Sequence, residues 1–356
     1  MIKQNYNVLG VMSGTSLDGV DLAHIIFDFK EGNWGFVINE AATIAYTDEW
    51  VEKLKEAVDY TKDQLSILNE DYTLLLGSII KNFIEENSIK NLDAVCSHGH
   101  TILHQPQNGF TLQIGNLPNI ASIVKEKVVC DFRVQDVELG GQGAPLVPIG
   151  DRLLFSRYRY CLNLGGFSNI SFEENGKRIA FDICPVNTVL NFYANQLGFD
   201  YDAGGAIAQK NSVITPLLDE LNNLPFYKLS YPKSLGYEFV KEIVLPIVDK
   251  YNESPENKLA TFTEHIAVQI ANVIKLKGEG ELLITGGGAY NNFLVNRLKQ
   301  LLPEIVISIP DDKTIQFKEA LIFALLGVLK LRGDINVLSS VTGASKDHSS
   351  GVIFEP

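Results

Sequence analysis

Residues Gly10 to Asp21 read GVMSGTSLDGVD and hold the feature that decides the fold. The stretch follows the apolar run Tyr6 to Leu9 and leads into a second apolar run, Val20 to Phe29, which predicts two strands joined by a glycine-rich turn. The turn has little side-chain bulk, two hydroxyls and a carboxylate, so its backbone can approach a phosphate with a divalent cation beside it. An ordinary hairpin, in which Asp18 bonds its own backbone, explains this turn alone equally well.

The composition is that of a soluble globular protein with two domains. The chain has 356 residues, of which 46% are hydrophobic and 21% are charged. A net charge of −13 argues against a general nucleic-acid or anionic-membrane surface. Neither the N-terminus nor the longest apolar stretch, Ala320 to Leu329, resembles a signal peptide or a membrane span. Four scattered cysteines predict buried thiols and a cytoplasmic protein.

The order of the expected elements repeats once along the chain. Each half shows the pattern β-β-β-α-β-α-β, the second beginning near Tyr160, and a last helix is expected from Lys318 to Leu331. The pattern predicts a duplicated α/β fold of the actin-like (ribonuclease H-like) kind, with ligands in an interdomain cleft. We expect domains at 1–135 and 136–339, with a C-terminal tail of about 340–356 that returns to the first domain.

Two polar turns in the second half are candidates for chemistry. Asp182 ends a strand just before a helix, so it is a candidate general base or metal ligand beside an anion-attracting helix end. Capping of the helix by this carboxylate is the alternative. The turn Gly286-Gly287-Gly288 permits close approach of a planar group or a sugar, with tight strand-to-helix packing as the alternative. The sequence thus predicts a second phosphate segment around Asp182 and an adenosine turn at Gly286, Gly287 and Gly288.

Further polar side chains suggest a substrate pocket. Arg133 precedes a flexible glycine-rich loop and can bind a carboxylate in a bidentate fork, or else pair with Asp136 at the surface. Glu319 begins an apolar helical run and faces either solvent or a site. The remaining cluster, SHGHT with a further histidine at 104, lacks a carboxylate or thiol at ligand spacing, so turn hydrogen bonding is favoured over zinc.

The motifs together resemble one family across nearly the whole chain, the anhydro-N-acetylmuramic acid kinases of the sugar kinase, actin and heat-shock chaperone superfamily. They occur in order as GVMSGTSLDGVD, SHGHT, QIGN, DFR, GGQGAPLVP, LNLGG followed by SNI, TGGGAYN and VTGAS. The resemblance implies a cytoplasmic, ATP-dependent enzyme of cell-wall recycling. Such an enzyme opens 1,6-anhydro-N-acetylmuramic acid with water and phosphorylates its 6-oxygen, giving N-acetylmuramic acid 6-phosphate and ADP.

The resemblance also assigns roles to residues. Asp182 is implied as the base that activates water, and Arg133 and Glu319 as the residues that contact the sugar. The ATP phosphates, with Mg2+ nearby, are implied at a set drawn from the first turn: Gly14, Thr15, Ser16, Leu17, Asp18, Gly19, Val20 and Asp21. The adenosine is implied at Gly286, Gly287 and Gly288. The expected partner is a small amino sugar, with no nucleic acid and no membrane, and the sequence leaves a homodimer open.

Several positions depart from the family pattern and keep two alternatives open. Where the family has a hydroxyl and two glycines after the catalytic aspartate, this chain has Ile183, Cys184 and Val186. Further departures are His100 for a glutamine, Gly204 for an aspartate, and Leu235 for a threonine. The alternatives are a kinase for another amino or anhydro sugar, and a nucleotide- or sugar-binding sensor with little catalysis.

Overall fold

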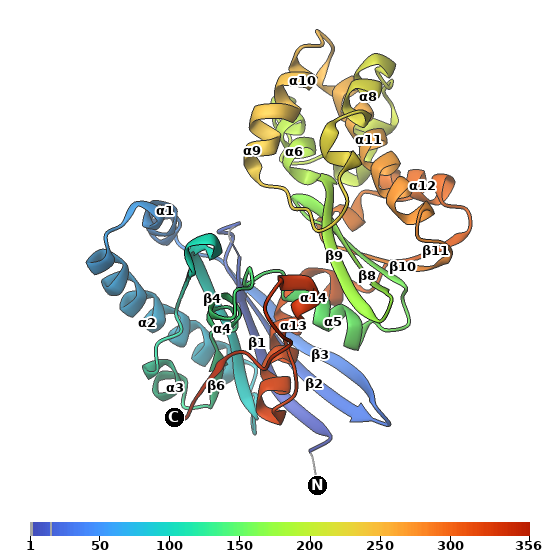
Figure 1. The fold of residues 1–356 in the computed structure, drawn as a ribbon. Coiled ribbons are helices and arrows are strands. Elements are labelled where there is room, and N and C mark those ends of the chain that lie inside the picture. Colours follow the sequence, from blue (N-terminus) through green and yellow to red (C-terminus); the bar gives the residue numbers. More distant parts are fainter. Residues whose placement is uncertain (1–2, 15) are drawn as a thin grey trace. The chain divides into compact units, whose positions relative to one another are not determined.

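The computed structural model describes residues 3–14 and 16–356, which form two compact units. The first unit combines Met1–Leu154 with Phe317–Pro356, and the second is Phe155–Gln316 (Figure 1). These bounds differ from the expected ranges 1–135 and 136–339. The structure assigns the segment from 136 to 154 and most of the last long helix to the first unit, because both pack on it.

A mixed sheet forms the centre of the first unit. Its strands follow the order β12-β6-β4-β1-β2-β3, with β5 paired to β4. β1 and β3 lie antiparallel to β2, β4 is parallel to β1, β6 is parallel to β4, and β12 is antiparallel to β6. The bounds are β1 Asn5–Ser13, β2 Val20–Lys30, β3 Asn33–Ile44, β4 Ala94–Gln105, β5 Phe110–Ile114, β6 Val128–Cys130 and β12 Val352–Phe354.

Helices surround this sheet. The longest of the early ones, α2 (Lys62–Glu86), begins with a capping box in which Thr61 and Gln64 exchange side-chain and backbone hydrogen bonds. Its apolar side chains enter the core that the sheet supplies. The other elements are α1 Asp48–Glu56, η1 Ala57–Asp59, η2 Pro106–Asn108, α3 Asn119–Val124, α4 Val134–Glu138, α5 Val147–Leu154 and α14 Ser339–Thr342.

The helix α13 (Asp312–Arg332) packs directly on the strands of the first unit. A Cβ at Gly10 of β1 would lie 2.1 Å from the carbonyl oxygen of Ala320, and a Cβ at Gly327 would lie 2.2 Å from Cys96 Sγ. Only glycine permits contact this close. α13 begins six residues before the expected start at Lys318, and Phe317 interrupts its helical dihedrals (φ −109°, ψ 18°) at the unit boundary.

The second unit repeats the sheet of the first. Its strands follow the order β11-β10-β7-β8-β9, with β7 antiparallel to β8, β8 antiparallel to β9, and β10 parallel to both β7 and β11. The series β3-β2-β1-β4-β6 of the first unit has the same order and the same directions. The predicted duplicated α/β class is therefore confirmed. The bounds are β7 Tyr160–Leu164, β8 Phe167–Glu174, β9 Lys177–Pro185, β10 Gly280–Thr285 and β11 Ile305–Ser308.

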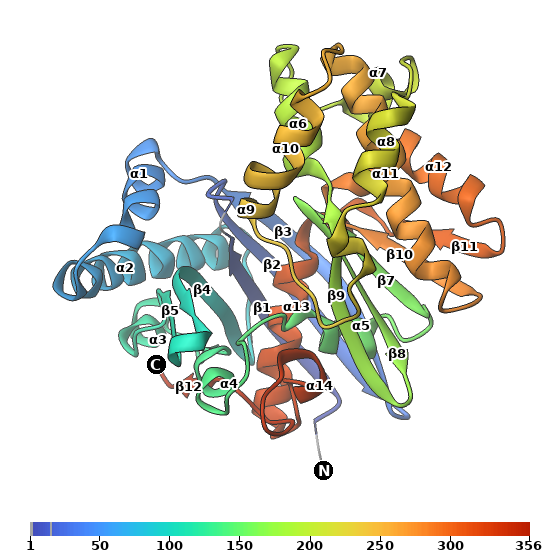
Figure 2. The ribbon, with the colours of Figure 1, turned by 45° about the horizontal axis from the view of Figure 1, so that its top comes forward.

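Helices and a long connection complete the second unit. Figure 2 shows α6, α8, α10 and α11 standing together, and α11 packs on β9 and supplies much of the core. The bounds are α6 Asn187–Gln196, η3 Ala203–Gly205, α7 Ala206–Gln209, α8 Thr215–Asn222, η4 Pro225–Lys228, α9 Tyr237–Phe239, η5 Val240–Val244, α10 Leu245–Asp249, α11 Pro255–Lys275, η6 Gly287–Tyr290 and α12 Asn292–Leu301.

Two composition-based predictions can be compared with the structure. The cysteines are free thiols and all are buried, as predicted: Cys96, Cys130, Cys161 and Cys184. Within residues 3–14 and 16–356, no helix has both the length and the apolar character that crossing a membrane requires.

Candidate active site

The turn between β1 and β2 is compact and internally bonded. Ser16 Oγ donates to Asp18 Oδ1 at 2.7 Å, and Leu17 has a left-handed backbone with φ 60°. Gly19 has φ 152°, and a Cβ there would lie 2.4 Å from the carbonyl oxygen of Ile44. Glycine is therefore required at 19 by packing as well as by conformation. Thr15, also predicted to contact phosphate, lies outside the described residues.

The carboxylate of Asp21 lies within the electrostatic influence of Asp18. Asp21 on β2 accepts a hydrogen bond of 2.6 Å from Thr43 Oγ1. Its pKa is raised above the usual value, first by burial and further by the negative charge of Asp18. A divalent cation relieves such repulsion, and Mg2+ is commonly held by one or two carboxylates together with substrate phosphates and water. Among the described residues no three His, Cys, Asp or Glu side chains group as a metal site, so this pair fits Mg2+ only with a phosphate completing the shell.

Arg133 is fixed by two neighbours within the first unit. Its Nε–H donates to His98 Nε2 at 2.8 Å, and Nη1 donates to the carbonyl oxygen of Gly143 at 2.6 Å. His98 is buried and its ring lies 4.6 Å from that of Phe323, tilted by 49°. Its pKa is well below the usual value because of burial and the charge of Arg133. The neutral ring accepts from Arg133 at Nε2, so its Nδ1–H donates to the Gly99 carbonyl at 2.9 Å.

The alternative pairing of Arg133 with an exposed Asp136 is wrong, because Asp136 is completely buried. Its Oδ2 accepts from the backbone N–H of Gly143 and its Oδ1 accepts from Thr342 Oγ1, both at 2.7 Å. The carboxylate therefore ties the glycine-rich loop after α4 to the C-terminal segment. Arg133 is held in place by the same loop, through the carbonyl of Gly143.

Glu319 shares its electrostatic environment with the hairpin and with Arg133. Its side chain reaches solvent, yet desolvation by the surrounding protein raises its pKa. The charge of Arg133 opposes that rise, whereas Asp21 and Asp18 add to it. Burial lowers the pKa of Arg133 to about 10, and the negative charges of Glu319 and, to a smaller extent, Asp136 counteract this. The structure thus brings four predicted site residues of the first unit into one set of interacting charges.

Asp182 lies on β9 of the second unit and is held by a neighbouring segment. Its backbone N–H donates to the Lys233 carbonyl at 3.1 Å, and its Oδ2 accepts from the backbone N–H of Leu235 at 2.8 Å. Burial raises the pKa of this carboxyl, and the bond from Leu235 works against that rise. The side chain remains partly open to solvent, so Oδ1 is the oxygen available to a substrate. Capping of α6, the alternative role, is not supported, because no side chain caps that helix.

The start of α6 does not offer the anion site that was predicted around Asp182. The backbone N–H groups of Val186 and Thr188 donate to the Gly166 carbonyl, and that of Asn187 donates to the Gly165 carbonyl. The helix end therefore has few free donors for phosphate. In the duplicated topology, the counterpart of the β1–β2 hairpin is the β7–β8 turn at Gly165 and Gly166.

The three glycines after β10 serve different purposes. A Cβ at Gly286 would lie 2.5 Å from Asn163 Oδ1, and one at Gly288 would lie 2.6 Å from Leu164 Cβ. Tight packing against β7, the alternative reading, therefore accounts for these two glycines. At Gly287 the nearest atom to an added Cβ is 3.8 Å away, on Asn187. Gly287 is thus the glycine of this turn whose surface is open to a ligand.

The other histidines of the SHGHT region take part in hydrogen bonds. His100 Nδ1 lies 2.8 Å from Ser13 Oγ, which is 2.6 Å from the hydroxyl of Tyr46, and that hydroxyl is 2.6 Å from Tyr72. Burial lowers the pKa of His100 to about 4. His104 Nδ1 contacts Thr111 Oγ1 at 3.1 Å. This chain of hydroxyls and imidazole supports the end of β1, where the hairpin begins.

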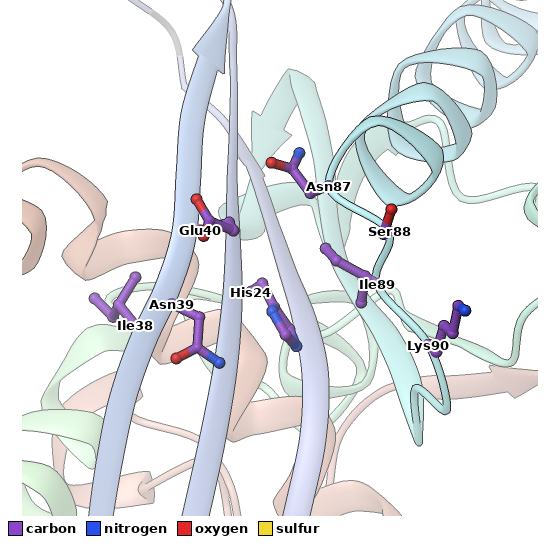
Figure 3. A pocket seen from close by; sticks show the side chains of 8 residues that line it. All are labelled: His24, Ile38, Asn39, Glu40, Asn87, Ser88, Ile89 and Lys90. Carbon is purple, nitrogen blue, oxygen red and sulfur yellow. The ribbon is translucent and has the colours of Figure 1, made fainter.

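A wide hollow of about 510 Å3 in the first unit holds none of the predicted site residues. Figure 3 shows its polar lining, with His24 on β2, Glu40 on β3, and Asn87 and Lys90 at the end of α2. His24 Nε2 lies 2.6 Å from Asn7 Oδ1, so its ring is anchored to β1. The hollow is a surface feature of the sheet edge rather than part of the set around Arg133.

Sequence reasoning missed three elements near the predicted site residues, one in the first unit and two in the second. They are the buried His98, the Gly165-Gly166 turn, and the segment from Lys233 to Leu235. The first two lie in motifs that the sequence displays, SHGHT and LNLGG. The third carries no local signal, because its contribution comes from backbone atoms.

The whole chain matches a known family. The sequence model described as "Anhydro-N-acetylmuramic acid kinase" matches residues 6–356. The chain belongs to the anhydro-N-acetylmuramic acid kinase family. Relatives with that name are 35% identical in Mannheimia succiniciproducens, covering 99% of this chain and 100% of the relative, and 33% identical in Haemophilus influenzae, covering 97% of each. A third, in Pseudomonas fluorescens, is 35% identical over 97% of this chain and 98% of the relative.

Family membership confirms the resemblance inferred from the motifs and places the chain among sugar kinases. A solved structure, the (R)-2-hydroxyglutaryl-CoA dehydratase component A of Acidaminococcus fermentans, has a TM-score of 0.46 and 16% identity over 92% of this chain and 99% of that chain. A similarity this low adds nothing to the topology described above. The fold assignment rests on the repeated strand order of the two units.

Proposed function

We propose that this chain uses ATP to convert 1,6-anhydro-N-acetylmuramic acid, with water, into N-acetylmuramic acid 6-phosphate and ADP. The observation that carries the proposal is the family match over residues 6–356, together with relatives of that name that cover at least 97% of the chain. The reaction places the enzyme in the cytoplasm, in peptidoglycan recycling. Light scattering on the purified chain decides whether it works as a homodimer.

We assign the ATP phosphates to the β1–β2 hairpin from Gly14 to Asp21. The donors there are backbone N–H groups and the hydroxyls of Thr15 and Ser16, and the charges are those of Asp18 and Asp21. These two carboxylates would hold Mg2+, which supplies charge neutralisation of the transferred phosphoryl group when bound. The pKa of Asp21, raised by burial and by the negative charge of Asp18, is the observation that supports a cation there. Adenosine is assigned to the Gly286–Gly288 turn, with Gly287 as the position open to contact.

Asp182 is assigned as the general base. Its Oδ1 would accept a proton from water while the water oxygen attacks the anomeric carbon. The bond between that carbon and the 6-oxygen then breaks, and the 6-oxygen bonds to the γ-phosphorus as ADP leaves. The hydrogen bond from Leu235 supports this role, because it fixes one carboxylate oxygen and leaves the other for the proton. A raised pKa makes the carboxylate a stronger base than an exposed aspartate.

Arg133 and Glu319 are assigned to the sugar. An arginine suits the lactyl carboxylate of a muramic sugar because its guanidinium offers paired donors in a fixed plane. The Nε hydrogen and one Nη1 hydrogen are committed to His98 and Gly143, which orients the plane and leaves the second Nη1 hydrogen and Nη2 as paired donors for the substrate. Glu319 would accept hydrogen bonds from sugar hydroxyls, and its interaction with Arg133 supports a shared role.

Three of the six positions that depart from the family pattern give no support to the two alternative functions. Ile183, Cys184 and Val186 expose 1% or less of their surface and belong to the hydrophobic core of the second unit. Their side chains therefore influence packing rather than substrate choice. This observation favours the family reaction over another sugar kinase or a sensor.

The proposal is tested by incubating the purified chain with Mg2+, ATP and 1,6-anhydro-N-acetylmuramic acid and following the products by mass spectrometry. We expect a product heavier than the sugar by one water and one phosphoryl group. ATP binding without that product contradicts the proposal. A product from another anhydro or amino sugar would support the second function instead.

A further inference from the structure

A second pocket, of about 230 Å3, lies in the second unit beside β9. Ile183 lines the pocket and directly follows Asp182, at the point where the pairing of β8 with β9 shifts register. The remaining wall comes from the end of α11, from η4 and from Lys233. None of the residues assigned to ATP or sugar lines it.

The floor of this pocket is a fixed polar network. Asn222 Oδ1 lies 2.8 Å from Gln269 Nε2 and 2.7 Å from His265 Nδ1, and His265 Nε2 lies 2.9 Å from the Tyr227 hydroxyl. Gln269 exposes only 5% of its surface. Within the part of the chain that the structure describes, no protein group forms a hydrogen bond with Gln269 Oε1 or Asn222 Nδ2. The pocket therefore presents one acceptor and two donor hydrogens on side chains that cannot easily turn away.

Two lysines add positive charge at the rim. Lys233 Nζ donates to the Phe226 carbonyl at 3.3 Å and lies over the rings of Phe181 and Phe226. Lys228 lines the pocket from η4. Over residues 3–14 and 16–356, neither lysine forms an ion pair with a carboxylate. Val273 and Leu276 complete the wall. The pocket therefore combines two cationic side chains, amide groups and a small apolar surface.

We propose that this pocket binds a small carboxylate that also carries an amide and a short aliphatic side chain, the chemistry of an N-acylated amino acid. The carboxylate would lie at Lys228 and Lys233. The amide N–H would donate to Gln269 Oε1, and its carbonyl would accept from Asn222 Nδ2. The aliphatic group would contact Val273 and Leu276. The volume suits a molecule of this size, because a cavity of about 150 Å3 already accepts benzene.

The pocket is connected to Asp182 through one segment. The connection from η4 to α9 runs beside β9 in both views (Figures 1 and 2). Its Lys233 side chain lines the pocket, while the Lys233 carbonyl and the Leu235 N–H bond to Asp182 at 3.1 and 2.8 Å. A ligand that binds the Lys233 side chain therefore also restricts the motion of the backbone that positions Asp182. This regulatory step rests on the proposed function, and it raises kcat by holding Asp182 in its reactive position.

Binding is tested by calorimetric titration of N-acetyl-L-leucine into the full chain, with neutral N-acetyl-L-leucinamide as the matched probe. We expect the carboxylate to bind about 10-fold more tightly than the amide, as for one lost charge-assisted bond. Gln269→Leu and Lys228→Met each weaken binding by about 5-fold or more. Lys210→Met, at an exposed lysine of the same unit, leaves it unchanged. The proposal is overturned if the two probes bind with equal affinity. It is also overturned if neither pocket variant changes the affinity for N-acetyl-L-leucine.

The connection is tested by hydrogen exchange, which does not depend on turnover. N-acetyl-L-leucine is expected to slow amide exchange in residues 229–236 of the wild type and not in Gln269→Leu. Binding without that protection overturns the regulatory step. A chain that binds the probe and protects the segment, yet forms no sugar phosphate, contradicts the proposed kinase function alone. A chain that forms sugar phosphate but does not bind the probe contradicts the pocket alone.

Discussion

The backbone N–H of Leu235 donates a hydrogen bond of 2.8 Å to Oδ2 of Asp182. The bond fixes the carboxylate without neutralising its negative charge, because a backbone N–H group is uncharged. One oxygen is thereby committed and the other is free to take a proton. A side chain at position 235 has little influence on this bond, so the departure to leucine there is compatible with a working base.

Replacing Asp182 by Asn is expected to abolish product formation, because the amide has the same shape but cannot accept a proton. General-base catalysis contributes about 10²- to 10⁴-fold, so kcat falls by about that factor while KM for ATP changes little. Steady-state ADP release and mass spectrometry of the sugar check this expectation. Product formed by the variant at the wild-type rate would assign the base elsewhere.

The same variant has a stability effect whose sign follows from the raised pKa of Asp182. The native carboxyl binds protons more tightly than the unfolded one, so the wild-type free energy of unfolding falls as pH rises from 3.8 through the native pKa. Asp182→Asn removes this pH-dependent loss of unfolding free energy, because asparagine does not titrate. Urea unfolding at pH 7 is therefore expected to find the variant at least as stable as the wild type, and a clearly less stable variant would contradict the desolvation argument.

His98→Leu is expected to destabilise the first unit and disturb Arg133. The variant leaves the Arg133 Nε–H without its acceptor in a buried place, which costs about 1–3 kcal/mol of unfolding free energy. KM for the sugar should rise more than kcat falls, because the guanidinium loses its orientation. His98→Gln, which keeps an acceptor, is the matched control and should recover part of both effects. Equal behaviour of the two variants would mean that the imidazole serves only as packing.

His100→Gln is expected to reduce the acid sensitivity of the protein. The native imidazole has a pKa of about 4 against 6.5 in the unfolded chain, so the unfolded state takes up a proton first as pH falls below 6.5. The wild type loses up to about 3 kcal/mol from this group by pH 4. The glutamine variant has no such proton uptake, so unfolding free energies measured from pH 7 to pH 4 should decline less steeply. Parallel curves for the two proteins would refute the assignment.

The glycines at 287 and 288 provide a matched pair of alanine substitutions. Gly288→Ala places a Cβ 2.6 Å from Leu164 Cβ, and overpacking of this kind costs about 1–3 kcal/mol. Gly287→Ala meets nothing closer than 3.8 Å and should leave the melting temperature unchanged. If the turn contacts adenosine, Gly287→Ala raises KM for ATP without loss of stability. Normal ATP kinetics in that variant would place the adenosine elsewhere.

The buried ion pair between Lys318 and Asp151 anchors the start of the first-unit part of α13. Nζ and Oδ1 lie 2.8 Å apart, with side-chain exposures of 7% and 6%. Lys318→Met leaves a buried carboxylate without its cation, which costs about 3–5 kcal/mol. The double variant Lys318→Met with Asp151→Leu should recover most of that loss, because no charge remains buried. Chemical denaturation of both variants measures the difference.

The sequence allowed the sheets and the hairpin to be predicted because their signals are local. In β2 the side chains of Val20 and Leu22, and after a register shift those of Ile25 and Phe27, alternate with less buried ones and are fully buried, and a glycine-rich turn precedes them. The start of α13 was placed too late, although a capping signal was present. Asp311 accepts a hydrogen bond of 3.0 Å from the Thr314 N–H, the pattern of a helix start.

The positions of the site residues could be predicted only as far as their types and their places at strand ends. No local sequence pattern indicates that Asp136 is buried and bonded to Thr342, which lies 206 residues later. No local pattern indicates that the carbonyls of Gly165 and Gly166 accept hydrogen bonds from the first N–H groups of α6. These contacts join segments distant in sequence, so they follow from the fold as a whole rather than from any motif.

The arrangement of the first unit from two separated segments has a consequence for biosynthesis. A ribosome that has released residues 1–154 has not yet made α13, which covers Gly10 and Cys96, or β12, which pairs with β6. The second unit, Phe155–Gln316, is continuous and has its own core, so it is complete as soon as it emerges. The unit whose synthesis begins first therefore finishes folding last. Until α13 and β12 are made, the sheet surface that they cover is exposed and available to chaperones.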